Sequence, residues 1–283
     1  MSIKSWSKTH FSPKKVLKTI FLLAFGLLFI SPLLWMISSS LKAPLEVFST
    51  SFSWIPEKIR WENYTRIWTD KQIPFTLLYY NSMKIAVLSV FGRVISSSLA
   101  AYAFAKMRFK GKGLIFTLFL GSIMIPGQVT IIPRFMLFHK LGLYNTHWAI
   151  IIPDWFNVTS IFLLVQFYKS LSDELMESAK IDGASHFQIW SRIVLPLTKP
   201  PMISIIILGF IGAWNEYFSS LVFLVSRDLY TVALGVRHYF TMEVHQFNLT
   251  MAAATSAIIP IVILFVFSQK YFVQAITKTG IKG

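Results

Sequence analysis

Long uncharged stretches constrain this chain more than any other feature of its sequence. Runs of 23 residues from Thr19 to Leu41, 21 from Gly113 to Pro133 and 24 from Gln246 to Gln269 contain no Asp, Glu, Lys or Arg. A helix of about 20 apolar residues spans the hydrocarbon core of a bilayer. With 54% hydrophobic residues, only 14% charged residues and a mean hydropathy of +0.59, the chain is predicted to be an all-α, polytopic membrane protein.

Six transmembrane helices account for the apolar segments. They are expected at 19–41, 81–105, 113–133, 147–168, the segment that follows Lys199-Pro200-Pro201 and includes 212–217, and 246–269. Ser38-Ser39-Ser40 offers a small-residue cleavage pattern, so the first run could be a signal peptide. Its 23 residues exceed the usual length of such a peptide, which favours a retained first helix.

Basic residues predict the orientation of the helices. Six spans place both termini on one side, and the segments then expected in the cytoplasm hold 16 Lys and Arg against 9 in the outer loops. The predicted organisation is a cytoplasmic tail (1–18), one transmembrane domain (19–273) with a cytoplasmic loop at about 170–198, and a cytoplasmic tail (274–283). The net charge of +15 is explained by these flanking residues in a plasma or inner membrane, without nucleic-acid binding.

The loop at 170–198 is patterned as two short helices around a turn. Ser170 with Asp173 can cap a first helix, and Gly183 stands where a left-handed C-terminal cap is needed. The apolar face of this helix is expected to consist of Leu171, Leu175 and Ala179. Local features alone leave two interpretations open, namely a docking site for another protein and an amphipathic loop on the membrane surface.

A second helix is predicted directly after the turn. Ser185 and Gln188 form a capping-box pattern, Ile189, Trp190 and Ile193 supply its apolar residues, and Leu195-Pro196 should end it. Small residues cluster at the bend and would let another protein approach the backbone: Ser178, Ala179, Gly183 and Ala184.

The spacing within this loop resembles a known signature. Glu177-x-Ala179, Gly183 six residues after the Glu, and nine further residues before Ile193-x-Leu195-Pro196 are similar to the cytoplasmic "EAA" loop of permease subunits of ATP-binding-cassette (ABC) importers. Ser178 stands where that motif has its first Ala. The resemblance implies that the loop fits a cleft on a cytoplasmic ATPase, with Glu177 facing a basic residue there. The implied contact set is Glu177, Ser178, Ala179, Asp182, Gly183, Ala184, Ile193, Leu195 and Pro196.

Three further stretches resemble the carbohydrate-uptake branch of these permeases, specifically the second subunit of the maltose-permease type. They are Leu141–Thr146, Gly212–Tyr217, and Gln269–Gln274 together with Gly280–Gly283.

The resemblance implies a five-helix core with a peripheral N-terminal helix. It also implies a sister permease in a heterodimer, two ATPase subunits that bind ATP and Mg while this chain binds no cofactor, and an extracytoplasmic binding protein. The solute would be an oligosaccharide or, alternatively, a glycerol-phosphate compound. The C-terminal residues Thr277, Lys278, Lys282 and Gly283 would contact the ATPase pair.

Charged residues inside spans are costly unless they face a cavity or a partner, so Arg93, Asp154 and Glu216 are functional candidates. Carboxylates accept hydrogen bonds from sugar hydroxyls, and indole faces stack on sugar rings. The candidates for a translocation pathway are Asp154, Trp155, Asn157, Trp214, Asn215, Glu216 and Gln128. A structural role for the acids, paired with Lys, Arg or backbone of neighbouring helices, is the favoured alternative. Prolines in the predicted spans could likewise mark gates or passive kinks.

No catalytic pattern emerges from the sequence. The six His show no metal-ligand spacing, there is no Ser/His/Asp arrangement, and no phosphate-binding Gly-rich loop is present, so ATP hydrolysis is assigned to other subunits. With no Cys, the chain has no disulfide or thiol nucleophile. An ion-coupled carrier or a membrane-embedded enzyme are the competing classes, but neither explains the loop around Glu177.

Overall fold

The computed structural model describes residues 13–49, 53–241 and 246–279, with the backbone alone from 270 onward. Within these ranges the chain is helical and contains no strand. The elements are α1 (Pro13–Ser40), η1 (Pro44–Glu46), α2 (Glu62–Trp68), α3 (Phe75–Lys106), α4 (Lys112–Gly121), η2 (Ser122–Met124), α5 (Ile131–Lys140), α6 (Trp148–Trp155), α7 (Val158–Lys169), α8 (Glu174–Ile181), α9 (His186–Ile189), η3 (Trp190–Val194), α10 (Leu195–Leu197), α11 (Lys199–Trp214), α12 (Phe218–Phe223), η4 (Arg227–Leu229), α13 (Val232–Thr241) and α14 (Phe247–Thr279).

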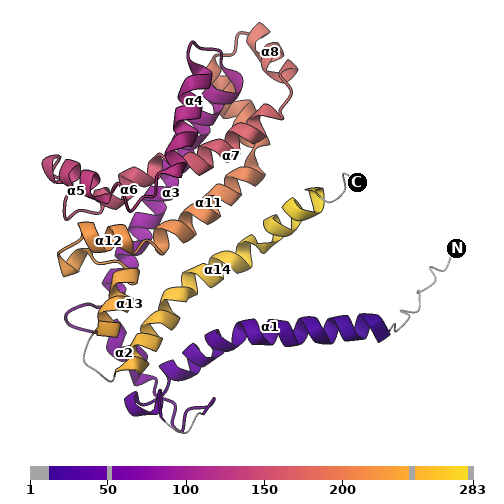
Figure 1. Cartoon of the computed structure of the whole chain (residues 1–283). Coiled ribbons are helices and arrows are strands. Elements are labelled where there is room, and N and C mark those ends of the chain that lie inside the picture. The colour runs from indigo at the N-terminus through magenta and orange to yellow at the C-terminus, as the bar shows by residue number, and fades with distance from the viewer. Residues whose placement is uncertain (1–12, 50–52, 242–245, 280–283) are drawn as a thin grey trace.

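Helix α3 is the central element of the fold. It packs against α6, α7, α11 and α13, and Figure 1 shows it running from the end that carries α2 to the end that carries α8. One stripe of its surface is buried at helical spacing, including Leu78, Ser82, Ile85, Ser89, Ser97 and Ala101. Small side chains in this stripe let the neighbouring helices approach closely, which is how helices associate when lipid surrounds them.

Four helices of the described chain are long and apolar enough to cross a membrane. They are α1, α3, the continuous segment Trp148–Lys169 that comprises α6 and α7, and α14 up to Gln269. A fifth is obtained if the segment His186–Leu197 and α11, which meet at an angle of 81°, are taken as one broken span. The structure therefore supports a polytopic helical membrane protein with four or five such spans.

Two of the predicted spans differ from the observed helices. The segment predicted at 113–133 is broken, because α4 and η2 end at Met124 and α5 begins at Ile131. Pro126 lacks an N–H, and residues 125–130 follow a turn-rich path instead. The helix predicted to include 212–217 ends at Trp214, so Asn215 and Glu216 lie between α11 and α12.

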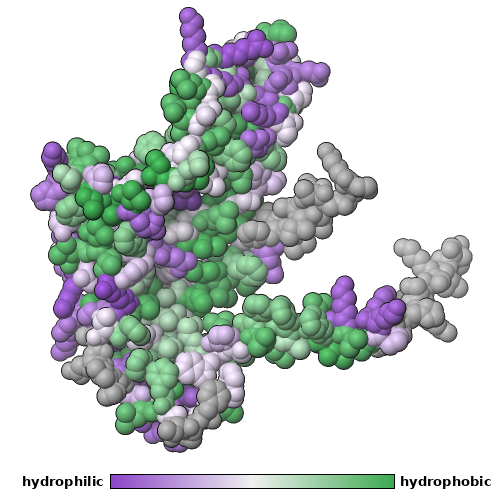
Figure 2. Space-filling view, in the orientation of Figure 1, coloured by the Kyte–Doolittle hydropathy of each residue, from purple (hydrophilic) through white to green (hydrophobic). Residues whose placement is uncertain are grey.

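Helix α1 lies apart from the rest of the molecule and packs mainly on α14 (Figure 1). Its apolar side chains are largely exposed, with Leu17, Leu27 and Phe29 all at 65% exposure or more. Figure 2 shows a hydrophobic surface along most of it, with hydrophilic residues towards its N-terminal end. Such a surface suits contact with lipid chains, as expected for a helix whose hydrophobicity extends around its whole circumference.

Candidate functional site

The first half of the loop at 170–198 is α8 closed by a glycine turn. Gly183 has a φ of +81°, its N–H donates to the carbonyl of Lys180 at 3.0 Å, and the N–H of Ala184 donates to the carbonyl of Ala179 at 2.9 Å. These two bonds form a Schellman motif, which satisfies the last carbonyls of the helix. The predicted role of Gly183 in the turn is confirmed.

The predicted start and buried face of α8 were partly wrong. The N-terminal residue Asp173 makes no side-chain cap, and Ser170 ends the preceding helix α7. Leu175 is 49% exposed, whereas Met176 is buried and Ala179 packs on the core. Asp173 has helical backbone angles (φ −74°, ψ −24°), whereas a capping residue has an extended backbone, which explains why its carboxylate does not cap the helix.

The second half of the loop begins with the predicted capping box. The Ser185 Oγ accepts from the N–H of Gln188, and the Gln188 Oε1 accepts from the N–H of Ser185 at 2.8 Å. Pro196 does not end the helix as predicted. A π-helix, η3, precedes it and α10 carries the chain on to Leu197, because Pro196 lies in the first turn of α10, where an N–H would have no partner within the helix.

Both halves of the loop rest on a hydrophobic core. Met176, Ile189, Trp190 and Val194 are buried in a cluster with residues of α3, α7 and α11. The outward side of the loop is open and partly apolar, with Ile181 at 87% and Phe187 at 65% exposure. A depression of about 330 Å³ lies between the halves, lined by Asp182, Gly183, Ala184, Gln188, Ile189, Arg192 and Ile193. Glu177 and Ser178 are also exposed.

Two side chains of α3 contact the loop. Lys106 Nζ donates to the Leu171 carbonyl at 2.7 Å and to the Asp173 carboxylate at 2.6 Å. The Tyr102 hydroxyl lies 3.0 Å from His186 Nδ1. The hydrogen bond from Lys106 lowers the pKa of the Asp173 carboxyl below its ordinary value, so this carboxyl stays charged at neutral pH. The sequence had pointed to neither Lys106 nor Tyr102 as a partner of the loop.

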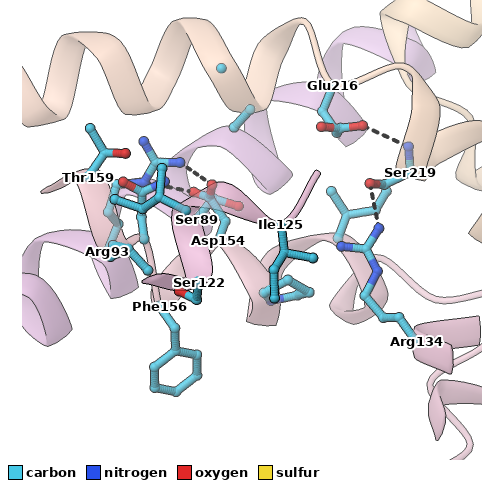
Figure 3. A pocket seen from close by; sticks show the side chains of 17 residues that line it. Ser89, Arg93, Ser122, Ile125, Arg134, Asp154, Phe156, Thr159, Glu216 and Ser219 are labelled. Atoms are coloured by element: carbon cyan, nitrogen blue, oxygen red, sulfur yellow. Dashed lines mark hydrogen bonds and ion pairs between the residues drawn. The ribbon is translucent and has the colours of Figure 1, made fainter. Parts of the chain in front are cut away.

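A second feature is a polar cavity of about 460 Å³ in the helical body (Figure 3). Side chains from α3, α5, α6, α7 and the α11–α12 junction surround it, and three of the pathway candidates line it, namely Asp154, Asn157 and Glu216. The other charged residues on its wall are Arg93 and Arg134. The cavity thus holds two acids and two bases.

Arg93 and Asp154 form an ion pair on one wall of this cavity (Figure 3). The guanidinium donates twice to the carboxylate, through Nε at 3.1 Å and through Nη2. The side chains are 9% and 22% exposed. The favoured alternative for Asp154, pairing with a base of a neighbouring helix, is therefore what the structure contains, although both groups still border the cavity.

Glu216, Ser219 and Arg134 form a second polar group (Figure 3). The Glu216 Oε1 accepts from the N–H of Ser219 at 2.7 Å, near the start of α12, and Arg134 Nη2 donates to the Ser219 Oγ at 2.9 Å. Arg134 also lies over the Phe223 ring, 5.1 Å from its centroid. Its Nε is buried and finds no hydrogen-bond partner among the described residues. Sequence reasoning missed Arg134, because it was counted as an ordinary loop cation.

The remaining pathway candidates lie outside the cavity. The indole of Trp155 packs on Gly92 of α3 and donates to the Leu88 carbonyl at 3.0 Å. Trp214 is buried and donates to the Ala257 carbonyl at 3.0 Å. Asn215 borders a different, mostly apolar pocket beside α14, and Gln128 is exposed in the break between η2 and α5.

Asn157 combines two positions. It lines the cavity, and its Oδ1 caps α7 by accepting from the N–H and Oγ of Ser160. Of the C-terminal candidates, Thr277 and Lys278 lie on the backbone of α14, which continues to Thr279. Lys282 and Gly283 lie outside the described residues, as do residues 1–12 of the predicted N-terminal tail.

Comparison with known proteins agrees with this architecture. The family described as "Binding-protein-dependent transport system inner membrane component" matches residues 92–278, which include α6, α7, the whole loop and most of α14. This chain belongs to that family. The predicted membership among ABC importer permeases is confirmed at this level.

Relatives of this permease are named for sugar transport. The arabinooligosaccharides transport system permease protein AraQ of Halalkalibacterium halodurans is 34% identical over 93% of this chain and 96% of its own length. The trehalose/maltose transport system permease protein MalG of Thermococcus litoralis is 33% identical over 95% of this chain and 98% of its own. A chain in the crystal structure of a bacterial ABC transporter involved in the import of the acidic polysaccharide alginate superposes with a TM-score of 0.81 and 25% identity, covering 96% of this chain and 100% of that chain.

Proposed function

We propose that this chain is a membrane-spanning permease subunit of an ABC importer for a carbohydrate, and that it forms the translocation pathway with a sister permease. An extracytoplasmic binding protein delivers the solute, and two cytoplasmic ATPase subunits bind ATP and Mg and hydrolyse the nucleotide. The six-span arrangement, with α1 peripheral and both termini in the cytoplasm, is part of this proposal.

The observation that carries the proposal is the geometry of the loop. Two short helices joined by the Gly183 turn present exposed apolar residues outward while their inner faces rest on the core. A soluble partner with a cleft could cover Ile181 and Phe187 and fill the depression beside Arg192. We assign the docking contacts to the outward residues of this loop, including Glu177, Ser178 and Asp182, and to the C-terminal end of α14.

The break between η2 and α5 supports a second membrane subunit. All residues from 121 to 130 are exposed, and 125–130 form no helix. Non-helical backbone at membrane depth is tolerated only where protein or a water-filled cavity surrounds it. A sister permease placed against this segment would cover Met124, which is 86% exposed, and would close the nearby cavity.

The charge of the cavity favours a neutral, hydroxyl-rich solute. Arg93 and Arg134 balance Asp154 and Glu216, so the cavity carries no surplus charge with which to hold an anion. Guanidinium groups donate and carboxylates accept hydrogen bonds, and together they complement sugar hydroxyls. The relatives named for arabinooligosaccharides and for trehalose/maltose support the same solute class.

The proposal is tested by purifying the chain with its sister permease and ATPase subunits and measuring uptake into vesicles. We expect uptake of a neutral oligosaccharide that requires ATP and the binding protein. Uptake that proceeds without nucleotide, driven by an ion gradient, would instead identify a secondary carrier and reject the proposal.

A further inference from the structure

Two side chains of α3, one helical turn apart, contact the two halves of the loop. Lys106 binds the segment before α8 through the Leu171 carbonyl and the Asp173 carboxylate, and Tyr102 contacts His186 at the start of α9. Residues four apart lie on the same face of a helix, so one face of α3 contacts both halves. The Lys106 side chain is only 5% exposed, whereas that of Asp173 is 79% exposed, so the lysine is the buried partner that fixes the position of the exposed carboxylate.

Helix α3 also contacts the wall of the cavity, through residues that precede Tyr102 in the helix. Arg93 pairs with Asp154, and the Ser96 hydroxyl donates to the Trp155 carbonyl. A second hydrogen bond joins the same two helices, because the Trp155 indole donates to the Leu88 carbonyl of α3 at 3.0 Å. Helix α3 therefore bonds to the end of α6 beside the cavity and to the loop.

The covalent connections of the loop, in contrast, pass through breaks in helical structure. Residues 170–173 between α7 and α8 are not helical. At the other end, the segment that ends at Leu197 meets α11 at 81°, around the buried Thr198. Neither joint continues a straight helix, whereas α3 is one uninterrupted helix from Phe75 to Lys106.

We propose that Tyr102 and Lys106 form a clamp that makes the loop and α3 move as one body, so that motion imposed on the loop reaches the Arg93–Asp154 wall of the cavity through α3. This inference rests on the proposed docking of an ATPase at the loop. Tyr102 and Lys106 are positioning residues, because they act on the pathway through α3 and do not contact solute.

The first test measures whether the loop and α3 move together. The chain contains no Cys, so Phe91→Cys on the exposed side of α3 and Glu174→Cys on α8 give it two unique sites for spin labels. The importer is assembled with partner subunits from which any accessible Cys has been removed. We expect the same inter-label distance without nucleotide and after trapping with ATP and vanadate. In a background with Tyr102→Phe and Lys106→Met, the distance should shift or broaden on trapping. A shift on trapping in the unmodified background, equal to that of the double variant, would overturn the clamp.

The second test measures solute transported per ATP hydrolysed. We expect Tyr102→Phe with Lys106→Met to lower this ratio by about tenfold, the size associated with loss of a charge-assisted hydrogen bond, while ATPase activity changes by less than about twofold. Using Lys106→Arg instead of Lys106→Met in the double variant should restore most of the ratio of solute transported to ATP hydrolysed. Lys110→Met is the matched control, because Lys110 is an exposed lysine four residues after Lys106, and it should leave the ratio unchanged.

The outcomes separate the clamp from the proposed function. An unchanged ratio in the double variant, in an importer whose unmodified form shows ATP-dependent uptake, rejects the clamp alone. Absence of ATP-dependent uptake in the unmodified, fully assembled importer rejects the proposed function and the clamp together.

Discussion

At the scale of single residues, the functional features depend on conformations and pairings that one side chain decides. Gly183 occupies a left-handed conformation that closes α8, and nothing lies within 4 Å of the position where a Cβ would be. Its importance is therefore a matter of backbone conformation and not of space. Asp154 and Arg93 illustrate the other case, in which two partners from separate helices neutralise each other.

Replacing Gly183 tests the turn. Gly183→Val should abolish transport while membrane insertion is retained, because a β-branched residue in the left-handed region costs about 1–2 kcal/mol and displaces the turn between the two halves of the loop. Uptake and the amount of protein in the membrane are measured together. Gly111→Val is the control, since Gly111 has a φ of +78° in a different loop; normal uptake by the Gly183 variant would count against the docking role.

Neutralising Asp154 tests whether the ion pair is structural. Asp154→Asn should lower stability by about 3 kcal/mol, because it leaves the largely buried Arg93 without its counter-charge. Thermal unfolding of the purified importer measures this loss. Adding Arg93→Met should recover part of it, since the pair is then removed as a whole. If Asp154→Asn leaves stability intact but weakens the apparent affinity for sugar, Asp154 is a solute contact instead.

At the scale of elements, close approach between helices determines how the cavity is built. A Cβ at Gly92 of α3 would lie 2.1 Å from the ring of Trp155 at the end of α6. The missing side chain is therefore what lets the indole lie against α3 and reach the Leu88 carbonyl. This contact also explains why Trp155 is turned away from the cavity although its neighbour Asp154 lines it.

A side chain added at Gly92 should push α3 away from α6. Gly92→Ala is expected to destabilise the protein by about 1–3 kcal/mol, the usual cost of overpacking, and to lower its thermal unfolding temperature. Gly26→Ala on α1, where no atom lies within 4 Å of the added Cβ, should be neutral or slightly stabilising, since Ala favours helix over Gly. Equal stability of the two variants would show that the α3–α6 contact is looser than described.

At the scale of the whole molecule, hydrophobic and charged surfaces are separated. Hydrophilic residues gather at the end that carries α8, whereas α1 presents an apolar surface along most of its length (Figure 2). The basic residues Lys106, Arg108, Lys110 and Lys112 lie at the end of α3 and the start of α4, close to the loop. Such a cluster is typical of the cytoplasmic side of a membrane protein.

Orientation in the membrane is predicted from this charge distribution. Because the chain has no Cys, single variants Lys180→Cys on α8 and Lys58→Cys before α2 can be labelled selectively, and both positions are exposed. A membrane-impermeant maleimide applied to intact cells should label Lys58→Cys and spare Lys180→Cys. The reverse pattern would place the loop outside, where no cytoplasmic ATPase could reach it.

The sequence by itself determined the membrane class, the helical architecture, the Gly183 turn and the Ser185 capping box, because these depend on apolar run length and on chemistry within a few residues. Only the tertiary structure decided which candidates share a cavity. It grouped Asp154 and Glu216 with Arg93 and Arg134, turned Trp155 and Trp214 into the packing, and brought Tyr102 and Lys106 onto the loop. The physical reason is that these contacts join residues 43 to 85 positions apart, and their side-chain directions follow from helix breaks and interhelical packing that no local pattern encodes.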